Sequence, residues 1–178
     1  MFKFKFRDDV SFLQVLTGVF CLVLSVVVLL GWLTGTSSLI QVYPDFAPMM
    51  PNTAVTFLLT GLVFLCHSYS LKRAGPVLTA LIFLLSALTF SQYLFNVDLG
   101  IDEILLPYNV SYMTYYPGRM APTTAISFCL LALGFFSIRF FREKYRFVVS
   151  GSIGAVLIGL GGISFAGYIN GSNSIYIW

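Results

Sequence analysis

Five long apolar spans constrain the fold of this chain more than any other feature of its sequence. The first runs from Val10 to Leu33 without a charged residue, and as an α-helix it is long enough to cross about 30 Å of hydrocarbon. A secretory signal peptide would have a shorter apolar segment of about 7–15 residues, followed by a small-residue cleavage site. We therefore expect a retained transmembrane helix over residues 10–33.

Four further spans have the same character, and we expect transmembrane helices over residues 51–71, 77–95, 122–141 and 147–168. The composition agrees with this assignment, because only 10% of the residues are charged, whereas ordinary soluble domains have about 25%. The predicted fold class is all-α, a polytopic transmembrane bundle of five helices that forms a single domain over residues 1–178.

The basic residues indicate how these helices are oriented. All of the lysines and arginines except Arg119 fall on one side when the chain is threaded through five helices. Cytoplasmic loops of membrane proteins carry an excess of lysine and arginine. The sequence therefore predicts a multi-pass membrane protein with its N-terminus in the cytoplasm. This placement also accounts for the net charge of +3 without a nucleic-acid partner.

A nine-residue motif occurs twice and indicates a tandem repeat of two-helix units. Met49–Phe57 returns 71 positions later as Met120–Phe128, and both copies read Met-x-Pro-x-Thr-Ala before an apolar span. Proline suits the first turn of a helix, because its missing N–H would have no partner there. We expect the motif to start two helices at the same depth, with Pro51, Ala54, Pro122 and Ala125 as structural residues.

A weaker repeat marks the C-terminal ends of three of the predicted helices. Trp32–Gly35, Tyr93–Asn96 and Tyr168–Gly171 each contain an aromatic residue, an aliphatic residue, a variable residue and then Gly or Asn. Gly and Asn often end helices, and aromatic residues are enriched at membrane interfaces. The third unit has no proline motif before Trp178. We therefore expect a longer parent protein with a sixth helix, and a natural five-helix protein is the alternative.

Two strings of the chain resemble a known family. Gln92–Leu106 (QYLFNVDLGIDEILL), followed by Pro117–Ala125 (PGRMAPTTA), is similar to the multi-helix sensor region that precedes PAS, histidine-kinase or diguanylate-cyclase (GGDEF) modules in bacterial signalling proteins. The resemblance covers about residues 11–178. The family has Asn where this chain has Thr123, and the first copy of the motif keeps Asn52. The resemblance implies a sensory input domain in the bacterial inner (plasma) membrane and no catalytic residue.

The loops opposite the basic side contain the candidate ligand-binding residues. The helix N-termini at Pro51 and Pro122, with Arg119 beside the second, favour an anionic or carbonyl-bearing ligand. Acidic residues of the long loop could bind a cation or an amine. The candidates are Arg119, Asp98, Asp102, Thr53 and Thr124. In the alternative interpretation Asp98 and Asp102 cap a short helix over residues 101–106, Arg119 pairs with one of them, and the loop tyrosines form an interfacial aromatic belt.

Other residue types indicate packing rather than chemistry. His67 is the only histidine, which favours a packing role over a haem or metal site, and we expect no cofactor and no metal. Four methionines, Met49, Met50, Met113 and Met120, are expected to plug the outer mouth rather than bind a soft metal. The small residues Gly151, Ala155 and Gly159 favour close helix packing within the chain, with a homodimer as the alternative.

The sequence thus predicts a membrane-embedded sensory input domain of a bacterial signal-transduction protein, of the histidine-kinase or diguanylate-cyclase type, with an unidentified stimulus. The expected partners are the lipid bilayer, a small ligand and a downstream output module. A small transporter or channel is an alternative, although the spans lack the charged residues that ion paths use. A non-catalytic membrane scaffold is another. An enzyme is not expected, because no set of catalytic groups converges at one depth.

Overall fold

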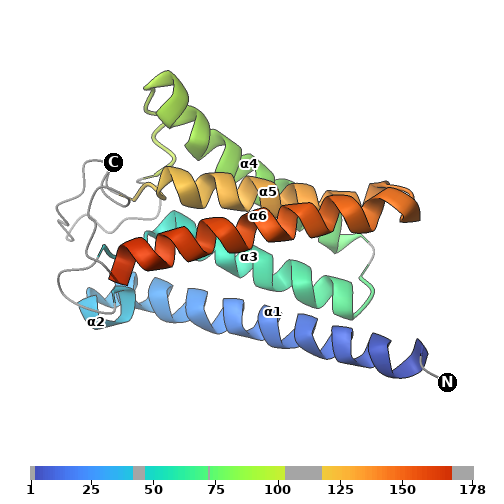
Figure 1. Ribbon diagram of the computed structural model, residues 1–178. Helices are drawn as coiled ribbons and strands as arrows, with labels where there is room; N and C mark the ends of the chain where they lie inside the picture. The colour runs from blue at the N-terminus through green and yellow to red at the C-terminus, as the bar shows by residue number, and fades with distance from the viewer. Residues whose placement is uncertain (1–2, 42–46, 72, 103–117, 170–178) are drawn as a thin grey trace.

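The computed structural model describes residues 3–41, 47–71, 73–102 and 118–169 (Figure 1). The described residues form helices and no strands, and five of these helices are long and apolar enough to cross a membrane. The prediction of an all-α polytopic fold is confirmed. The helices are α1 (Lys3–Thr34), α2 (Ser37–Ile40), α3 (Pro51–Ser68), α4 (Ala74–Phe95), α5 (Pro122–Phe140) and α6 (Glu143–Ile169).

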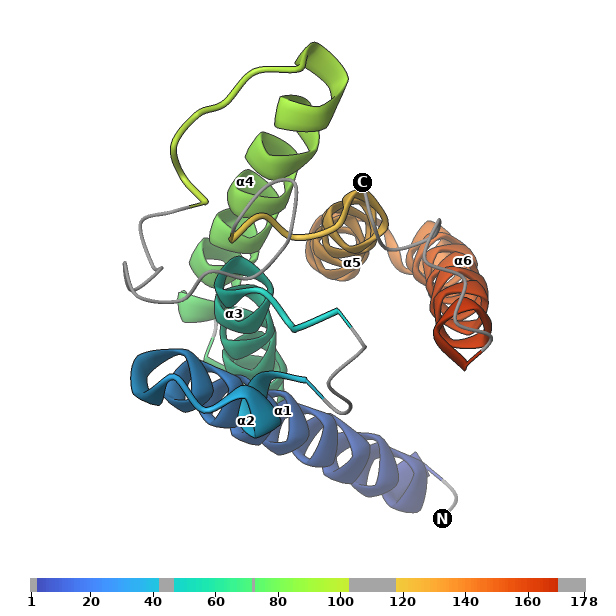
Figure 2. The same cartoon turned by 90° about the vertical axis from the view of Figure 1, so that its left-hand side faces the viewer.

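The five long helices run back and forth, and each packs against the next long helix in the chain. Helix α6 packs against α5 and lies at the edge of the bundle, away from α1 (Figure 2). The end where α1, α4 and α6 begin, and where α3 and α5 end, is called the basic end here. Of the described lysines and arginines, only Arg119 lies at the opposite end, the loop end, beside the start of α5.

Three of the long helices end in the left-handed backbone conformation that reverses the chain direction. Gly35, Ser70 and Asn96 have φ angles of 68°, 58° and 50°. Gly and Asn were expected at two of these ends, but Ser70 was not. Helix α3 ends at Ser68, three residues before the predicted residue 71. The left-handed conformation of Ser70 turns the chain so that the Leu71 amide donates to the Cys66 carbonyl, and this hydrogen bond closes the helix.

Three helices begin earlier than predicted, and the first of them, α1, begins at Lys3 rather than residue 10. Gly75 and Pro76 lie before the predicted helix over residues 77–95, but they belong to the first turn of α4, which begins at Ala74. A proline there sacrifices no hydrogen bond, because first-turn amides have no partner within the helix. Helix α6 likewise begins at Glu143, four residues before the predicted residue 147.

The repeat seen in the sequence is also present in the packing. Helix α1 aligns with α4 when Trp32 is matched to Tyr93, 61 positions later. With this alignment the same positions are buried in both helices: Gly18, Cys21, Ser25 and Val28 in α1, and Thr79, Ile82, Ser86 and Thr89 in α4. The two helices therefore occupy equivalent places in their units although few of these side chains are identical.

In each repeat unit an equivalent hydrogen bond joins the aromatic residue at the end of one helix to the segment before the motif proline. The indole N–H of Trp32 donates to the carbonyl of Met49 at 2.8 Å. The hydroxyl of Tyr93 donates to the carbonyl of Met120 at 3.0 Å. Each acceptor lies two residues before the motif proline. The interfacial aromatic residue of each unit thus fixes the segment that leads into that unit's proline helix.

Helices α3 and α5 meet through equivalent phenylalanines. Phe57 stacks edge-on against Phe128, with ring centroids 5.1 Å apart, and Phe64 does the same against Phe135 at 5.2 Å. Both pairs are separated by the 71-residue motif offset. Contact between equivalent residues is the mark of a symmetric interface. The helices that the motif starts are therefore related by a local symmetry axis along the bundle.

One packing expectation is wrong. The α6 residues Gly151 and Gly159 are exposed, and a Cβ atom at either would meet no other described atom within 4 Å. They therefore do not mediate close packing within the described chain. The described methionines have the expected packing role: Met120 is buried in the core around Ile82, and Met50 in a second core around Trp32 against which Met49 packs. Met113, most of the expected helix over residues 101–106, and the loop tyrosines lie outside the described residues.

Candidate functional site

The candidate site at the loop end begins where α4 ends. Gln92 lies in the last turn of α4 and is 1% exposed. Asn96 ends the helix with a positive φ, and Gly100 has a φ of 66°. Between them, the carboxylate of Asp98 accepts the amide of Gly100 at 2.9 Å. This turn returns the chain to Gln92, whose side-chain oxygen accepts the Leu99 amide at 2.8 Å.

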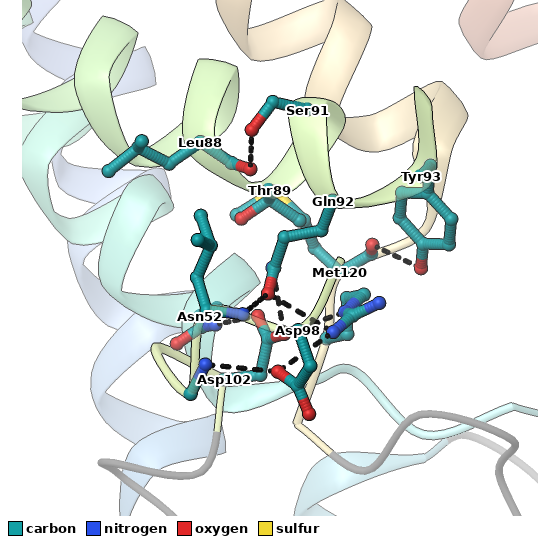
Figure 3. Close-up of polar contacts among 12 residues, drawn as sticks. Asn52, Leu88, Thr89, Ser91, Gln92, Tyr93, Asp98, Asp102 and Met120 are labelled. Atoms are coloured by element: carbon teal, nitrogen blue, oxygen red, sulfur yellow. Dashed lines mark hydrogen bonds and ion pairs between the residues drawn. The ribbon is translucent and has the colours of Figure 1, made fainter. Parts of the chain in front are cut away.

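The carboxylate of Asp102 is the centre of the site. Its Oδ2 accepts Nε of Arg119 at 2.6 Å and Nε2 of Gln92 at 2.9 Å. Its Oδ1 accepts Nδ2 of Asn52 at 3.0 Å. These donors come from the start of α3, the end of α4 and the segment before α5, as Figure 3 shows for the labelled side chains of Asn52, Gln92 and Asp102. One buried carboxylate therefore connects both repeat units.

The guanidinium of Arg119 is bound on several sides. Its side chain and that of Asp102 are each 4% exposed, so the ion pair is buried. Its Nη2 donates to Oε1 of Gln92 at 3.1 Å and to Oδ1 of Asp98 at 3.2 Å. Its Cζ lies 5.4 Å from the ring centroid of Tyr93, within range of a cation–π interaction. We call Asn52, Gln92, Asp98, Asp102 and Arg119 the loop-end network.

The electrostatics of the network follow from burial. Removing a carboxylate and a guanidinium from water is costly, and the cost is offset only when both are paired and hydrogen-bonded. Asp102 and Arg119 meet this condition, and each neutralises the other. Asp98 differs, because its side chain is 71% exposed and its contact with Arg119 is weakened by solvent. The network therefore holds one strong ion pair and one weak one.

Three of the five predicted ligand-binding residues, Arg119, Asp98 and Asp102, come together at this site. The alternative in which Arg119 pairs with one of the acids is what the structure shows. Pro51 and Pro122 start their helices as expected, and Ala54 and Ala125 are fully buried. Binding of an external ligand by these residues stays a prediction.

Thr53 and Thr124 are not members of the network. Among the described residues, no hydrogen bond involves the side-chain hydroxyl of either threonine. Thr53 is nevertheless buried, at 9% exposure. The hydroxyl one turn later does make a local bond, from Thr56 to the Asn52 carbonyl at 2.7 Å. The motif threonines are therefore placed at the helix start without a role in the ion-pair network.

Asn52 and Gln92 were not among the predicted site residues. Asn52 occupies a variable position of the repeated motif, where the second copy has Thr123. Gln92 lies near the end of a helix that contains no charged residue, where an amide side chain is costly to bury without partners. That cost was the signal that could have identified Gln92, and the difference between the two motif copies could have identified Asn52.

The loop-end network joins α3, α4 and the segment before α5, and it does not bring together a set of reactive groups. Within the described part of the chain, no three His, Cys, Asp or Glu side chains converge in a way that could hold a metal ion. Comparison of the chain with protein-family models, with curated proteins and with solved structures found no match.

Proposed function

We propose that this chain is the membrane-embedded sensory input domain of a bacterial signal-transduction protein, of the histidine-kinase or diguanylate-cyclase type. The observation that carries the proposal is the loop-end network. Four of its five members, Gln92, Asp98, Asp102 and Arg119, come from the two strings that resemble the sensor regions. The residues behind the resemblance thus have a common physical role, which is to join the repeat units at one end of the bundle.

The network suits a switch between two packing states. Asp102 binds donors from three segments at once, so a change at any one of them alters the other two. Packed helices have discrete arrangements rather than continuous ones, and small shifts at one site are therefore amplified into helix movements. In this proposal a stimulus at the loop end loosens or rearranges the network, and the helices carry the change to the basic end.

The distribution of charge supports an orientation for this signal. The described basic residues other than Arg119 lie at the basic end, which by the positive-inside rule faces the cytoplasm. The loop-end network then faces the exterior of the inner membrane, and the turns around Arg73 and Arg142 face an output module. The stimulus is received outside and the response is produced inside.

The test uses cells that express the complete reading frame encoding this chain. Asp102→Asn and Arg119→Gln should each change the output of the attached module, measured as autophosphorylation or as cyclic di-GMP. Asp98→Asn, a matched amide substitution at an exposed member, should change it less. A frame that encodes no such module, or an output that is the same in all three variants as in the wild type, would contradict the proposal.

A further inference from the structure

A cavity of about 310 Å³ lies at the basic end, far from the loop-end network, between the end of α3, the start of α4 and the end of α5. Its volume is within the range of small-ligand sites. The lining residues are Cys66, His67, Ser70, Leu71, Gly75, Pro76, Thr79, Phe135, Phe136 and Arg139. Because it opens at the ends of membrane-spanning helices, the cavity lies at the depth of the lipid headgroups.

The polar part of the cavity favours an anion. Arg139 contributes a permanently charged guanidinium, and no acidic residue is among the lining residues. The imidazole of His67 makes a hydrogen bond through Nδ1 to the carbonyl of Val63 at 3.0 Å. The carbonyl can only accept, so Nδ1 carries the proton, and Nε2 of the neutral imidazole is an acceptor that suits a hydroxyl group next to the anion. Gly75 and Pro76 add the positive end of the α4 dipole.

The apolar part of the cavity favours an amphiphile over a free ion. Phe135 stacks on His67 with ring centroids 5.4 Å apart, and Phe136, Leu71 and Pro76 complete an apolar wall. The absence of a side chain at Gly75 keeps the space beside the imidazole open, since an added Cβ would lie 3.8 Å from the imidazole Cε1. A soluble phosphate would leave these apolar surfaces in water.

We propose that this cavity binds the headgroup of an anionic phospholipid, with Arg139 at the phosphate, Nε2 of His67 accepting from a headgroup hydroxyl, and the phenylalanines along the first part of an acyl chain. Basic pockets between transmembrane helices are suited to such headgroups. The site joins the ends of three helices, so a bound lipid would hold α3, α4 and α5 together at the basic end. This inference does not depend on the proposed sensory function.

The experiment measures lipid retention by the purified full chain in detergent micelles, by native mass spectrometry with added phosphatidylglycerol or phosphatidylcholine. Wild type should retain phosphatidylglycerol several-fold better than phosphatidylcholine. Arg139→Gln should lower phosphatidylglycerol retention about tenfold, the effect of one charge-assisted hydrogen bond. Arg142→Gln removes the same charge three residues further on, outside the cavity, and should change retention less than about twofold.

Two further arms make the outcome decisive. His67→Phe keeps a ring against Phe135 but removes both nitrogens, and it should also lower phosphatidylglycerol retention. Inorganic phosphate in large excess should not displace the lipid. Equal losses in Arg139→Gln and Arg142→Gln would show general surface attraction and overturn the proposal. Displacement by inorganic phosphate would show a soluble-anion site and overturn the lipid assignment.

Discussion

Arg119 and Asp102 form a buried ion pair in which Nε lies 2.6 Å from Oδ2 and each side chain is only 4% exposed. The two residues are 17 positions apart in the chain, Asp102 after the end of α4 and Arg119 before the start of α5. Because Asp102 also accepts from Asn52 at the start of α3, this pair connects the first repeat unit to the second.

Replacing Asp102 with Asn should strongly destabilise the protein. The substitution leaves the guanidinium of Arg119 buried beside a neutral group, and loss of one partner of a buried ion pair costs about 3–5 kcal/mol. Asp98→Asn is the matched control. Because the Asp98 carboxylate is 71% exposed, its loss should lower the free energy of unfolding by about 0–1 kcal/mol. Denaturant unfolding of both variants in micelles makes the comparison, and equal losses would refute the assignment of Asp102 as the centre.

Exchanging residues between the two motif copies should have unequal effects. Asn52→Thr introduces the residue found at the equivalent position of the second copy, and it removes the hydrogen bond to Asp102. We expect a loss of about 1–3 kcal/mol, because the acceptor is a buried carboxylate. Thr123→Asn makes the reverse exchange where the structure describes no such acceptor, and it should cost less. Unfolding measurements that rank the two variants in the opposite order would contradict this account of the network.

The sequence predicted the helices better than their ends. Long uncharged spans and the motif prolines located all five membrane helices, because both signals are local. The end of α3 was misplaced because it depends on the left-handed conformation of Ser70, a residue type that does not usually adopt it. The start of α4 was misplaced because the predicted helix began after Pro76, whereas a proline fits within the first helical turn.

The site was predicted only in part, and the reason is again physical. The charges of Arg119, Asp98 and Asp102 marked the correct end of the bundle. Asn52 and Gln92 are neutral, and their importance arises only when the turn after Asn96 brings Asp102 back against α4 and α3. That approach is a long-range contact, which no local pattern encodes. The exposed glycines of α6 show the opposite case, in which a clear local pattern has no described partner.

The crossing of α1 and α3 should not tolerate a larger residue. A Cβ atom at Gly61 would lie 2.7 Å from the carbonyl oxygen of Gly18, so Gly61→Ala must push the two helices apart. Overpacking of this kind costs about 1–3 kcal/mol. Gly159→Ala is the control, because its Cβ would meet no described atom within 4 Å. If Gly61→Ala unfolds at the same denaturant concentration as Gly159→Ala, the close approach of α1 and α3 is wrong.

The proposed orientation predicts which surface residues can be labelled from outside the cell. Thr36 lies at the loop end and Tyr145 at the basic end, and both are exposed. In a background with Cys21, Cys66 and Cys129 replaced by alanine, Thr36→Cys should react with a membrane-impermeant maleimide in intact spheroplasts. Tyr145→Cys should react only after permeabilisation. The reverse pattern would place the basic end outside and contradict the positive-inside assignment.

The central claim is that the loop-end network controls how the helices pack at the basic end. The most direct measurement is the distance between spin labels at Tyr69 and Phe141, which are exposed at the ends of α3 and α5, in the same cysteine-free background reconstituted in lipid. Asp102→Asn should shift or broaden the distance distribution, and Asp98→Asn should leave it close to that of the wild type. If Asp102→Asn folds and gives the wild-type distribution, the network does not communicate with the basic end, and the proposed switch is wrong.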